Sequence, residues 1–281
     1  CVDGLGSLGC ITKELPNDLV DSLGGNRLTM YADGSIWSRL VRRMGTMGTV
    51  VLGLLLCCVV APLAIPVLWL VDRIRTCPAV GVRTYLCMTA ILGLELLGVV
   101  LAMGLTLLHW VGPLRDSERF QRANYRLQWL WGSWQLTSAM RLFHLKLETS
   151  GTELVRPGPV LVFIRHVSMP DTLLPPAVIS LPHALRLRYV VKDALLYDPC
   201  LDLVGNNTPN AFVARGKDNA GDLAKIRWLC EGLRDGDGIV IYPEGTRFTP
   251  DKRARVIERF RKKGDETAVA YAESLKHVLP P

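Results

Sequence analysis

The sequence predicts two parts: an N-terminal transmembrane or membrane-embedded helical hairpin, followed by an α/β domain with a mostly parallel or mixed sheet flanked by helices. Two long apolar runs predict the hairpin, since each exceeds the roughly 20 residues that cross a bilayer core. Short β-rich segments that alternate with helical periodicity predict the α/β domain. The predicted boundaries are 1–43 for an N-terminal segment of unassigned role, 44–114 for the hairpin, 115–144 for an amphipathic linker helix and 145–281 for the α/β domain.

Two apolar runs form the predicted hairpin. Residues 46–71 contain no charged side chain, and residues 84–114 contain only Glu95. A cleaved secretory signal is the alternative for the first run, but that run is too long for a signal and a second apolar run follows it. Pro62 and Pro66 predict a kink in the first helix. Glu95 is a functional candidate by its position, although a hydrogen bond from its carboxyl group to a neighbouring helix explains it better.

The arginines that flank the two runs predict the orientation of the hairpin. More of them lie outside the hairpin than in its turn, and basic residues favour the cytoplasmic side. We therefore expect both ends of the hairpin, and the α/β domain, on the cytoplasmic face. A hairpin that dips into one leaflet without crossing is also compatible, because the turn has arginines of its own. The arginines are Arg27, Arg39, Arg42 and Arg43 before the hairpin, Arg115, Arg119, Arg122 and Arg126 after it, and Arg73, Arg75 and Arg83 between the runs.

The net charge of +7 and the pI of about 9.1 fit a protein that works against an anionic surface. Nucleic acid and anionic lipid are both compatible with this positive charge. The hairpin favours membrane lipid, so no nucleic-acid partner is expected. None of the eight cysteines has C-x-x-C spacing, so they are predicted to be reduced, and the five dispersed histidines predict no metal site. The chain begins at Cys1, which indicates a fragment or a processed form, with a lipid-modified cysteine as the alternative.

Alternating aromatic and polar side chains predict an amphipathic helix within 115–144. Its aromatic residues allow two interpretations, packing in a core or contact with the membrane interface. Further along, five β-rich segments predict strands, and apolar residues at helical spacing predict a helix within 218–236. The aromatic residues are Phe120, Tyr125, Trp129, Trp131 and Trp134, and the strand segments are 145–151, 159–165, 187–191, 211–215 and 238–246.

The stretch "FIRHVSMPDT" (163–172) places His166 and Asp171 five positions apart. On one continuous helix their side chains would point about 140° apart, so the chain must change from strand to helix between them. Ser168 and Asp171 have the spacing of a capping box, and Pro170 suits a first helical turn. Asp171 can then hold the imidazole of His166, which gives the base and the orienting acid of a catalytic triad. The alternative is that Asp171 only caps a helix and His166 is a polar loop residue.

The stretch "IYPEGTRF" (241–248) follows another apolar strand. The guanidinium of Arg247 can bind a phosphate through two hydrogen bonds, Gly245 allows close approach of the backbone, and Thr246 adds a hydroxyl donor. The carboxylate of Glu244 would repel a phosphate, so we expect it to orient Arg247 or a substrate hydroxyl. The alternative is a tight turn with a surface pair of Glu244 and Arg247.

Together, "RHVSMPD" and "YPEGTR" behind a membrane hairpin resemble the glycerophospholipid acyltransferase family, which is typified by 1-acylglycerol-3-phosphate acyltransferases. His166 and Asp171 match the family's NH-x4-D motif, and residues 242–247 match its FPEGTR motif. The resemblance covers about half of the chain, from about residue 145 onward. It implies an α/β acyltransferase domain after the hairpin.

Two further segments are similar to the family. Phe212 and Arg215 match an intermediate F-x-x-R motif, and "VVKDALLYDPCLDLVG" resembles a segment that brings Lys192 near the site. The chain departs from the family at Arg165, where an asparagine is usual. It also ends at "HVLPP", where the family's fourth motif would begin, so the domain is expected to be incomplete at its C-terminus.

The resemblance implies transfer of a fatty acyl group from an acyl-CoA or acyl-carrier-protein thioester to the hydroxyl of a lysophospholipid, with no bound cofactor. It implies that His166 takes the hydroxyl proton and that Asp171 stabilises the imidazolium. Arg215 and Arg247 would bind the acceptor phosphate, and Lys192 or a helix N-terminal N–H would stabilise the oxyanion. A catalytically inactive lipid-binding or scaffolding membrane protein on the same fold is the alternative. A serine hydrolase is disfavoured, since the sequence has no G-x-S-x-G elbow.

Overall fold

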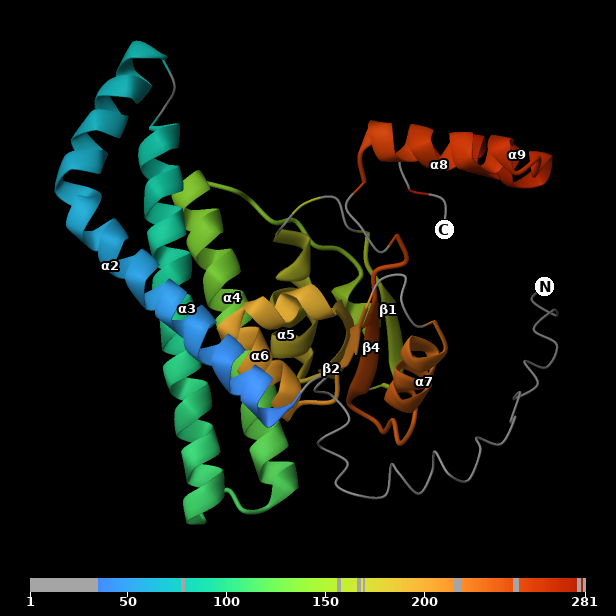
Figure 1. The fold of residues 1–281 in the computed structure, drawn as a ribbon, viewed down its shortest axis with the longest axis horizontal. Helices are drawn as coiled ribbons and strands as arrows, with labels where there is room; N and C mark the ends of the chain where they lie inside the picture. Colours follow the sequence, from blue (N-terminus) through green and yellow to red (C-terminus); the bar gives the residue numbers. More distant parts are fainter. Residues whose placement is uncertain are drawn as a thin grey trace.

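The computed structural model describes residues 35–76, 79–155, 158–165, 168, 170–214, 219–244, 248–276 and 279, so most of the predicted N-terminal segment lies outside it. Two long helices, α2 (Ile36–Ile74) and α3 (Val80–Val111), form a hairpin, and an α/β domain lies beside them (Figure 1). Both helices are long and apolar enough to cross a membrane. The predicted fold class is therefore confirmed.

Side-chain caps define the ends of the hairpin helices. The hydroxyl of Ser35 accepts a hydrogen bond from the N–H of Ser38 (3.2 Å), so α2 begins upstream of the apolar run. At the turn, the carboxylate of Asp72 accepts hydrogen bonds from the N–H groups of Gly81 (3.0 Å) and Val82 (3.1 Å). These N–H groups lie in the first turn of α3, where a helix offers its donors no internal acceptor. Asp72 therefore fixes the turn between the two helices.

The apolar side chains of the hairpin point outward over much of its length. Val59 is 77% exposed, Leu63 is 70% exposed and Leu107 is 64% exposed. An exposed apolar surface of this extent marks a contact with a membrane or with another protein. Helix α2 also bends along its length (Figure 1), as predicted from Pro62 and Pro66, because each proline removes a helical hydrogen bond.

Helix α4 (Ser117–Phe143) lies between α3 and the α/β domain. Of the two interpretations of its aromatic residues, packing in a core is right for Phe120, Tyr125 and Trp129, all of which are buried. Trp131 is partly buried and packs against the cluster that joins α4 to its neighbours. The amphipathic pattern of this segment therefore reflects contact with protein on its apolar side.

Four parallel strands form one sheet in the order β1-β4-β2-β3. Phe163 pairs with Ile241 across β1 and β4, and Lys192 pairs with Val213 across β2 and β3. Because the strands are parallel, their carboxyl ends meet at one edge of the sheet. The strands are β1 (Val160–Phe163), β2 (Arg186–Lys192), β3 (Ala211–Val213) and β4 (Asp237–Ile241).

Helical segments cover both faces of the sheet. On one face, Leu187 and Val240 pack with Ile179 of the π-helix η3, and on the other, Ile239 packs with Leu229 of α7. The segments near the sheet are η1 (Thr152–Leu154), η2 (Pro170–Thr172), η3 (Pro175–Ser180), α5 (Leu181–His183), η4 (Asp193–Tyr197), α6 (Pro199–Asn207) and α7 (Asn219–Leu229), and α8 (Pro250–Lys262) and α9 (Glu266–Ser274) follow β4.

The strand predicted at 145–151 is wrong. This segment connects α4 to the domain in an irregular conformation. Its apolar residues Leu145 and Leu147 are about half exposed, at 54% and 44%. The alternation of apolar and polar residues therefore does not correspond to a buried face of a sheet here. The other four predicted strands are confirmed.

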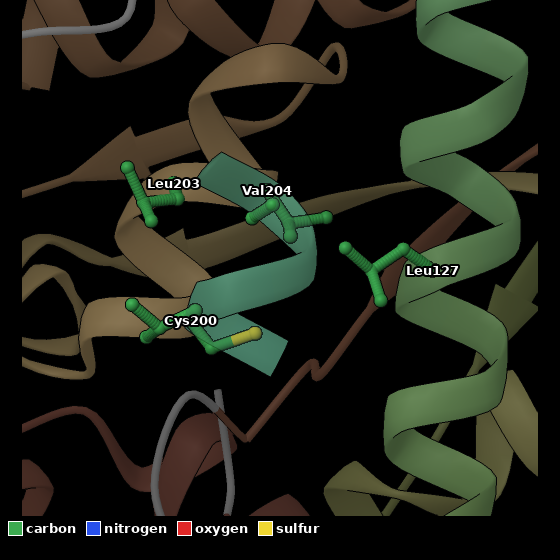
Figure 2. Close-up of a cluster of buried hydrophobic side chains, with 6 residues drawn as sticks. Leu127, Cys200, Leu203 and Val204 are labelled. Atoms are coloured by element: carbon green, nitrogen blue, oxygen red, sulfur yellow. The ribbon is translucent and has the colours of Figure 1, made fainter. Parts of the chain in front are cut away.

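Helix α6 attaches the hairpin to the α/β domain. Figure 2 shows Cys200, Leu203 and Val204 of α6 close to Leu127 of α4, and buried residues of α3 complete this apolar cluster. Every member of the cluster is at most 9% exposed. Helices α3 and α4 therefore share an apolar cluster with α6 of the α/β domain.

Buried polar contacts reinforce the same attachment. Asp202 of α6 is fully buried and forms ion pairs with Arg42 (3.1 Å) and Arg43 (3.0 Å) of α2. The carboxylate of Glu95, in the middle of α3, accepts a hydrogen bond from the N–H of Cys200 (2.8 Å) at the start of α6. Glu95 is thus hydrogen-bonded to another helix, as predicted, but the partner is α6 of the α/β domain and not the other helix of the hairpin.

A substitution at Gly98 tests this packing. A Cβ atom at Gly98 would lie 2.5 Å from the sulfur of Cys200 and 2.8 Å from Cδ1 of Trp131, whereas a Cβ at Gly93 would meet no atom within 4 Å. We predict that Gly98→Ala lowers the midpoint of thermal unfolding in detergent, by the equivalent of about 1–3 kcal/mol for an overpacked core. Gly93→Ala, in the same helix, should be neutral or stabilising by about 0.5–1 kcal/mol. Equal stability of the two variants would contradict the close contact of α3 with α6.

Candidate active site

The sheet brings the two sequence motifs to the same place. The segment "RHVSMPD", which we call the first motif, follows β1, and "YPEGTR", which we call the third motif, follows β4. These two strands are neighbours. The N–H of Ile164 donates to the carbonyl of Ile241 (3.0 Å), which extends the pairing to the last residue before Arg165. Both motif segments therefore leave the sheet at its carboxyl edge, where ligands bind in open α/β sheets.

Asp171 lies in the short helix η2, close to the end of β1. Its two oxygens accept hydrogen bonds from the N–H (2.6 Å) and the hydroxyl (2.7 Å) of Ser168. The predicted capping interaction between these two residues is therefore confirmed. It fixes the direction of the Asp171 carboxylate, as a residue that orients a catalytic base requires.

Tyr242, the first residue of the third motif, lies close enough to Asp171 for the two side chains to interact electrostatically. Burial raises the pKa of the Tyr242 phenol, and the carboxylate of Asp171 raises it further. The raised pKa keeps the phenol protonated over a wider pH range than that of an ordinary tyrosine. This electrostatic contact joins the first motif to the third, which the sequence pattern alone did not predict.

Glu244 is the second link between the motifs. Its side chain is 2% exposed, and it forms an ion pair with Arg165, which is 52% exposed (Nε to Oε1, 3.6 Å). Its other oxygen accepts a hydrogen bond from the N–H of Leu279 (3.3 Å). The side chain of Glu244 is thus buried, while Arg247, its partner in the predicted surface pair, lies outside the described residues. We expected it to orient Arg247 or a substrate hydroxyl, and among the described residues the cation beside it is Arg165.

Lys192 ends β2, the strand that lies beside β4. It is partly buried, and its extended backbone (φ −73°, ψ 144°) begins the short helix η4. Its pairing partner Val213 is two positions before Arg215. Lys192 therefore lies at the same sheet edge as the two motifs, and its role in the site stays a prediction.

Five of the predicted site residues lie outside the described residues, so their roles stay predictions. The structure does describe the strand that precedes each of them. They are His166 in the first motif, Arg215 after β3, and Gly245, Thr246 and Arg247 in the third motif.

Three features of this site were not predicted as parts of it: the ion pair of Arg165 with Glu244, the partly buried phenol of Tyr242 near Asp171, and the hydrogen bond from the N–H of Leu279 to Glu244. Arg165 was visible in the sequence only as a departure from the family pattern. The sequence did contain a signal for this contact, because Arg165 and Glu244 have opposite charges and lie in two motifs that were expected to meet. Among the described residues, no group of three or more His, Cys, Asp and Glu side chains could hold a metal ion.

Comparison with known proteins agrees with this geometry. The family model described as Acyltransferase matches residues 146–274, which include the whole sheet. This match confirms that the part of the chain from residue 146 to residue 274 resembles the glycerophospholipid acyltransferases. Searches of curated proteins and of solved structures returned no match.

The contact between Arg165 and Glu244 can be tested by a double-mutant cycle. Arg165→Ala should lower the melting temperature, because it leaves a buried carboxylate without its cation. Glu244→Gln removes the charge, so adding Arg165→Ala to it should cost less. We expect a coupling energy of about 0.5–1 kcal/mol, since Arg165 is half exposed. Arg227→Ala, an exposed arginine of α7, serves as the control and should change little. Additive effects of Arg165→Ala and Glu244→Gln would show that the ion pair contributes nothing.

Proposed function

We propose that this chain is a membrane-bound O-acyltransferase. It transfers a fatty acyl group from acyl-CoA or acyl-carrier protein to the hydroxyl of a lysophospholipid such as 1-acylglycerol-3-phosphate, in phospholipid synthesis or remodelling. The observation that carries the proposal is the parallel pairing of β1 with β4, in which Phe163 lies beside Ile241. Because of it, the segments with "RHVSMPD" and "YPEGTR" leave neighbouring strands at one edge of an acyltransferase-family domain.

The reaction needs one base. His166 takes the proton of the acceptor hydroxyl as its oxygen attacks the thioester carbonyl, and Asp171 stabilises the imidazolium. The C–S bond then breaks, and the thiolate leaves with the proton from His166. A carboxylate has about four acceptor positions, so the two hydrogen bonds from Ser168 to Asp171 (2.6 and 2.7 Å) are compatible with a third from the imidazole. No acyl-enzyme forms.

The acceptor phosphate binds to Arg215 and Arg247, with Thr246 and the backbone at Gly245 as further donors. A guanidinium can donate two hydrogen bonds to one phosphate, which fixes the direction of the acceptor hydroxyl. Lys192 or a helix N-terminal N–H stabilises the oxyanion. Support for these roles comes from β2 and β3, which end at the same edge of the sheet as the two motifs.

The hairpin of α2 and α3 anchors the enzyme in the membrane, and the α/β domain faces the cytoplasm. Exposed apolar side chains such as Val59 and Leu63 support an anchor. Glu95 contacts the N-terminus of α6, and α4 packs along α3, so part of α3 is covered by protein. These contacts favour a hairpin that dips into one leaflet over one that crosses the bilayer.

Acyl transfer with a panel of acceptors tests the proposal. Membranes that contain the full-length protein should convert at least one lysophospholipid to its diacyl form in the presence of acyl-CoA or acyl-carrier protein. An acceptor with a phosphate should be used faster than the matching monoacylglycerol, because the latter lacks the anion that Arg215 and Arg247 bind. Lipid binding without turnover of any acceptor would favour the alternative of an inactive lipid-binding protein.

The role of the base predicts a specific loss of turnover. His166→Ala should lower kcat by roughly 10²-fold or more, the scale of general-base catalysis. Asp171→Asn should also lower kcat, because an amide stabilises the imidazolium less well. His183→Ala is the control, since this histidine lies in α5 on a face of the sheet. A folded, membrane-bound His166→Ala variant with near-normal kcat would rule out the mechanism.

Phosphate binding predicts a different kinetic change. Arg247→Lys keeps the charge but loses the two-pronged geometry, so KM for the phosphorylated acceptor should rise much more than KM for the acyl donor. Arg227→Lys, on the exposed side of α7, should leave both constants unchanged. If Arg247→Lys lowered only the melting temperature, Arg247 would be a structural residue of a turn and not a phosphate ligand.

A further inference from the structure

Helix α8 carries a row of basic side chains on one face. Arg255, Arg259, Lys262 and Lys263 are all exposed. Arg255, Arg259 and Lys262 follow one another at spacings of four and three, which places them along the same side of α8, and Lys263 is the C-cap residue that comes directly after them. We refer to these four residues as the basic stripe. It lies outside the candidate active site.

The opposite side of α8 is held against α9. Ile257 and Ala272 are buried between the two helices. The guanidinium of Arg253 donates to the carbonyls of Leu275 (2.6 Å) and Glu273 (2.9 Å), which end α9. This packing fixes the rotation of α8 about its axis. The basic stripe is therefore presented to solvent by the fold itself.

The nearby acids leave the stripe positive. Glu258 and Glu273 both pair with Arg261, which is not part of the stripe. Asp251 lies in the first turn of α8, where the helix dipole favours an acid. Asp251 and Glu258 flank the stripe on the helix surface, so four exposed cations against two acids leave this face positive, which complements an anionic partner.

The position of α8 indicates which anionic partner this is. The chain leaves the carboxyl end of β4 at Ile241 and enters α8 at Pro250, so α8 lies near the edge of the sheet with the candidate site. Figure 1 shows α8 toward the same end of the molecule as the turn between α2 and α3. A bilayer that receives this end of the hairpin would therefore lie close to α8.

We propose that the basic stripe of α8 binds the anionic headgroups of the membrane that holds the hairpin. The contact would set the angle of the α/β domain to the membrane and bring the carboxyl edge of the sheet toward its lipid substrate. This inference goes beyond the proposed acyl transfer and rests only on its membrane anchor. Binding of this kind depends on the charge of the lipid and is screened by salt.

Acetylation of native lysines tests the proposal in the full-length protein. The protein is reconstituted in vesicles of phosphatidylcholine alone, or of phosphatidylcholine with phosphatidylglycerol, and treated with a water-soluble acetylating reagent. Mass spectrometry then gives the modification of Lys262 and Lys263 relative to Lys225 of α7. We expect several-fold protection of Lys262 and Lys263 in the anionic vesicles only. The protection should disappear at about 1 M salt, where the Debye length is about 3 Å.

Paired variants locate the contact. Arg255→Gln with Arg259→Gln should abolish the protection, while Arg119→Gln with Arg122→Gln should retain it, since these exposed arginines lie at the start of α4. Equal modification in both kinds of vesicle, or equal loss in both variant pairs, would overturn the proposal. Protection by free RNA but not by vesicles would assign the stripe to nucleic acid and also overturn it. Flotation with neutral vesicles measures the insertion of the hairpin into the membrane separately. Loss of the membrane anchor can therefore be distinguished from loss of headgroup binding by the basic stripe.

Discussion

The close approach of β1 and β4 is the constraint on which the candidate site depends. Two glycines permit it: a Cβ at Gly158 would lie 2.1 Å from the carbonyl oxygen of Asp237, and one at Gly238 would lie 2.7 Å from Cγ2 of Val160. A larger residue at either position would have to move the backbone or a packed side chain. The register of the two strands then aligns the segments that contain the two motifs, so the chemistry follows from how closely these backbones pack.

The opposite edge of the sheet has a structural role. Buried Asp237, which begins β4, forms ion pairs with Arg186 (2.7 Å) and Arg188 (3.4 Å) of β2. Arg188 also donates to the carbonyl of Leu229 (2.9 Å) at the end of α7. These contacts fix the amino ends of the central strands and a covering helix. Ion pairs at one edge therefore hold the sheet, while the polar residues of the motifs gather at the other.

Local pattern predicted much of this fold. Apolar runs predicted the hairpin, and β-rich segments predicted four of the strands, but the segment 145–151 failed because alternation does not reveal whether a partner strand exists. The strand order β1-β4-β2-β3 could not be predicted from the sequence, since neither strand propensity nor motif spacing specifies which strands pair. The same holds for Arg165 with Glu244 and for Asp202 with α2, because such contacts join residues far apart in the chain. At the site, the strand ends and the capping of Asp171 were predicted, whereas the cation beside Glu244 was not.

Acceptor-dependent release of thiol from acyl-CoA tests the central claim most directly, which is direct acyl transfer at the carboxyl edge of the sheet. Vesicles with the full-length protein would be mixed with acyl-CoA, and free thiol followed as a lysophospholipid acceptor is added. The account predicts no release without acceptor, saturable release with it, and one diacyl lipid for each thiol. Equal release without acceptor would indicate a hydrolase. A burst that leaves an acyl group on the protein would indicate a covalent mechanism, and either result would contradict the account.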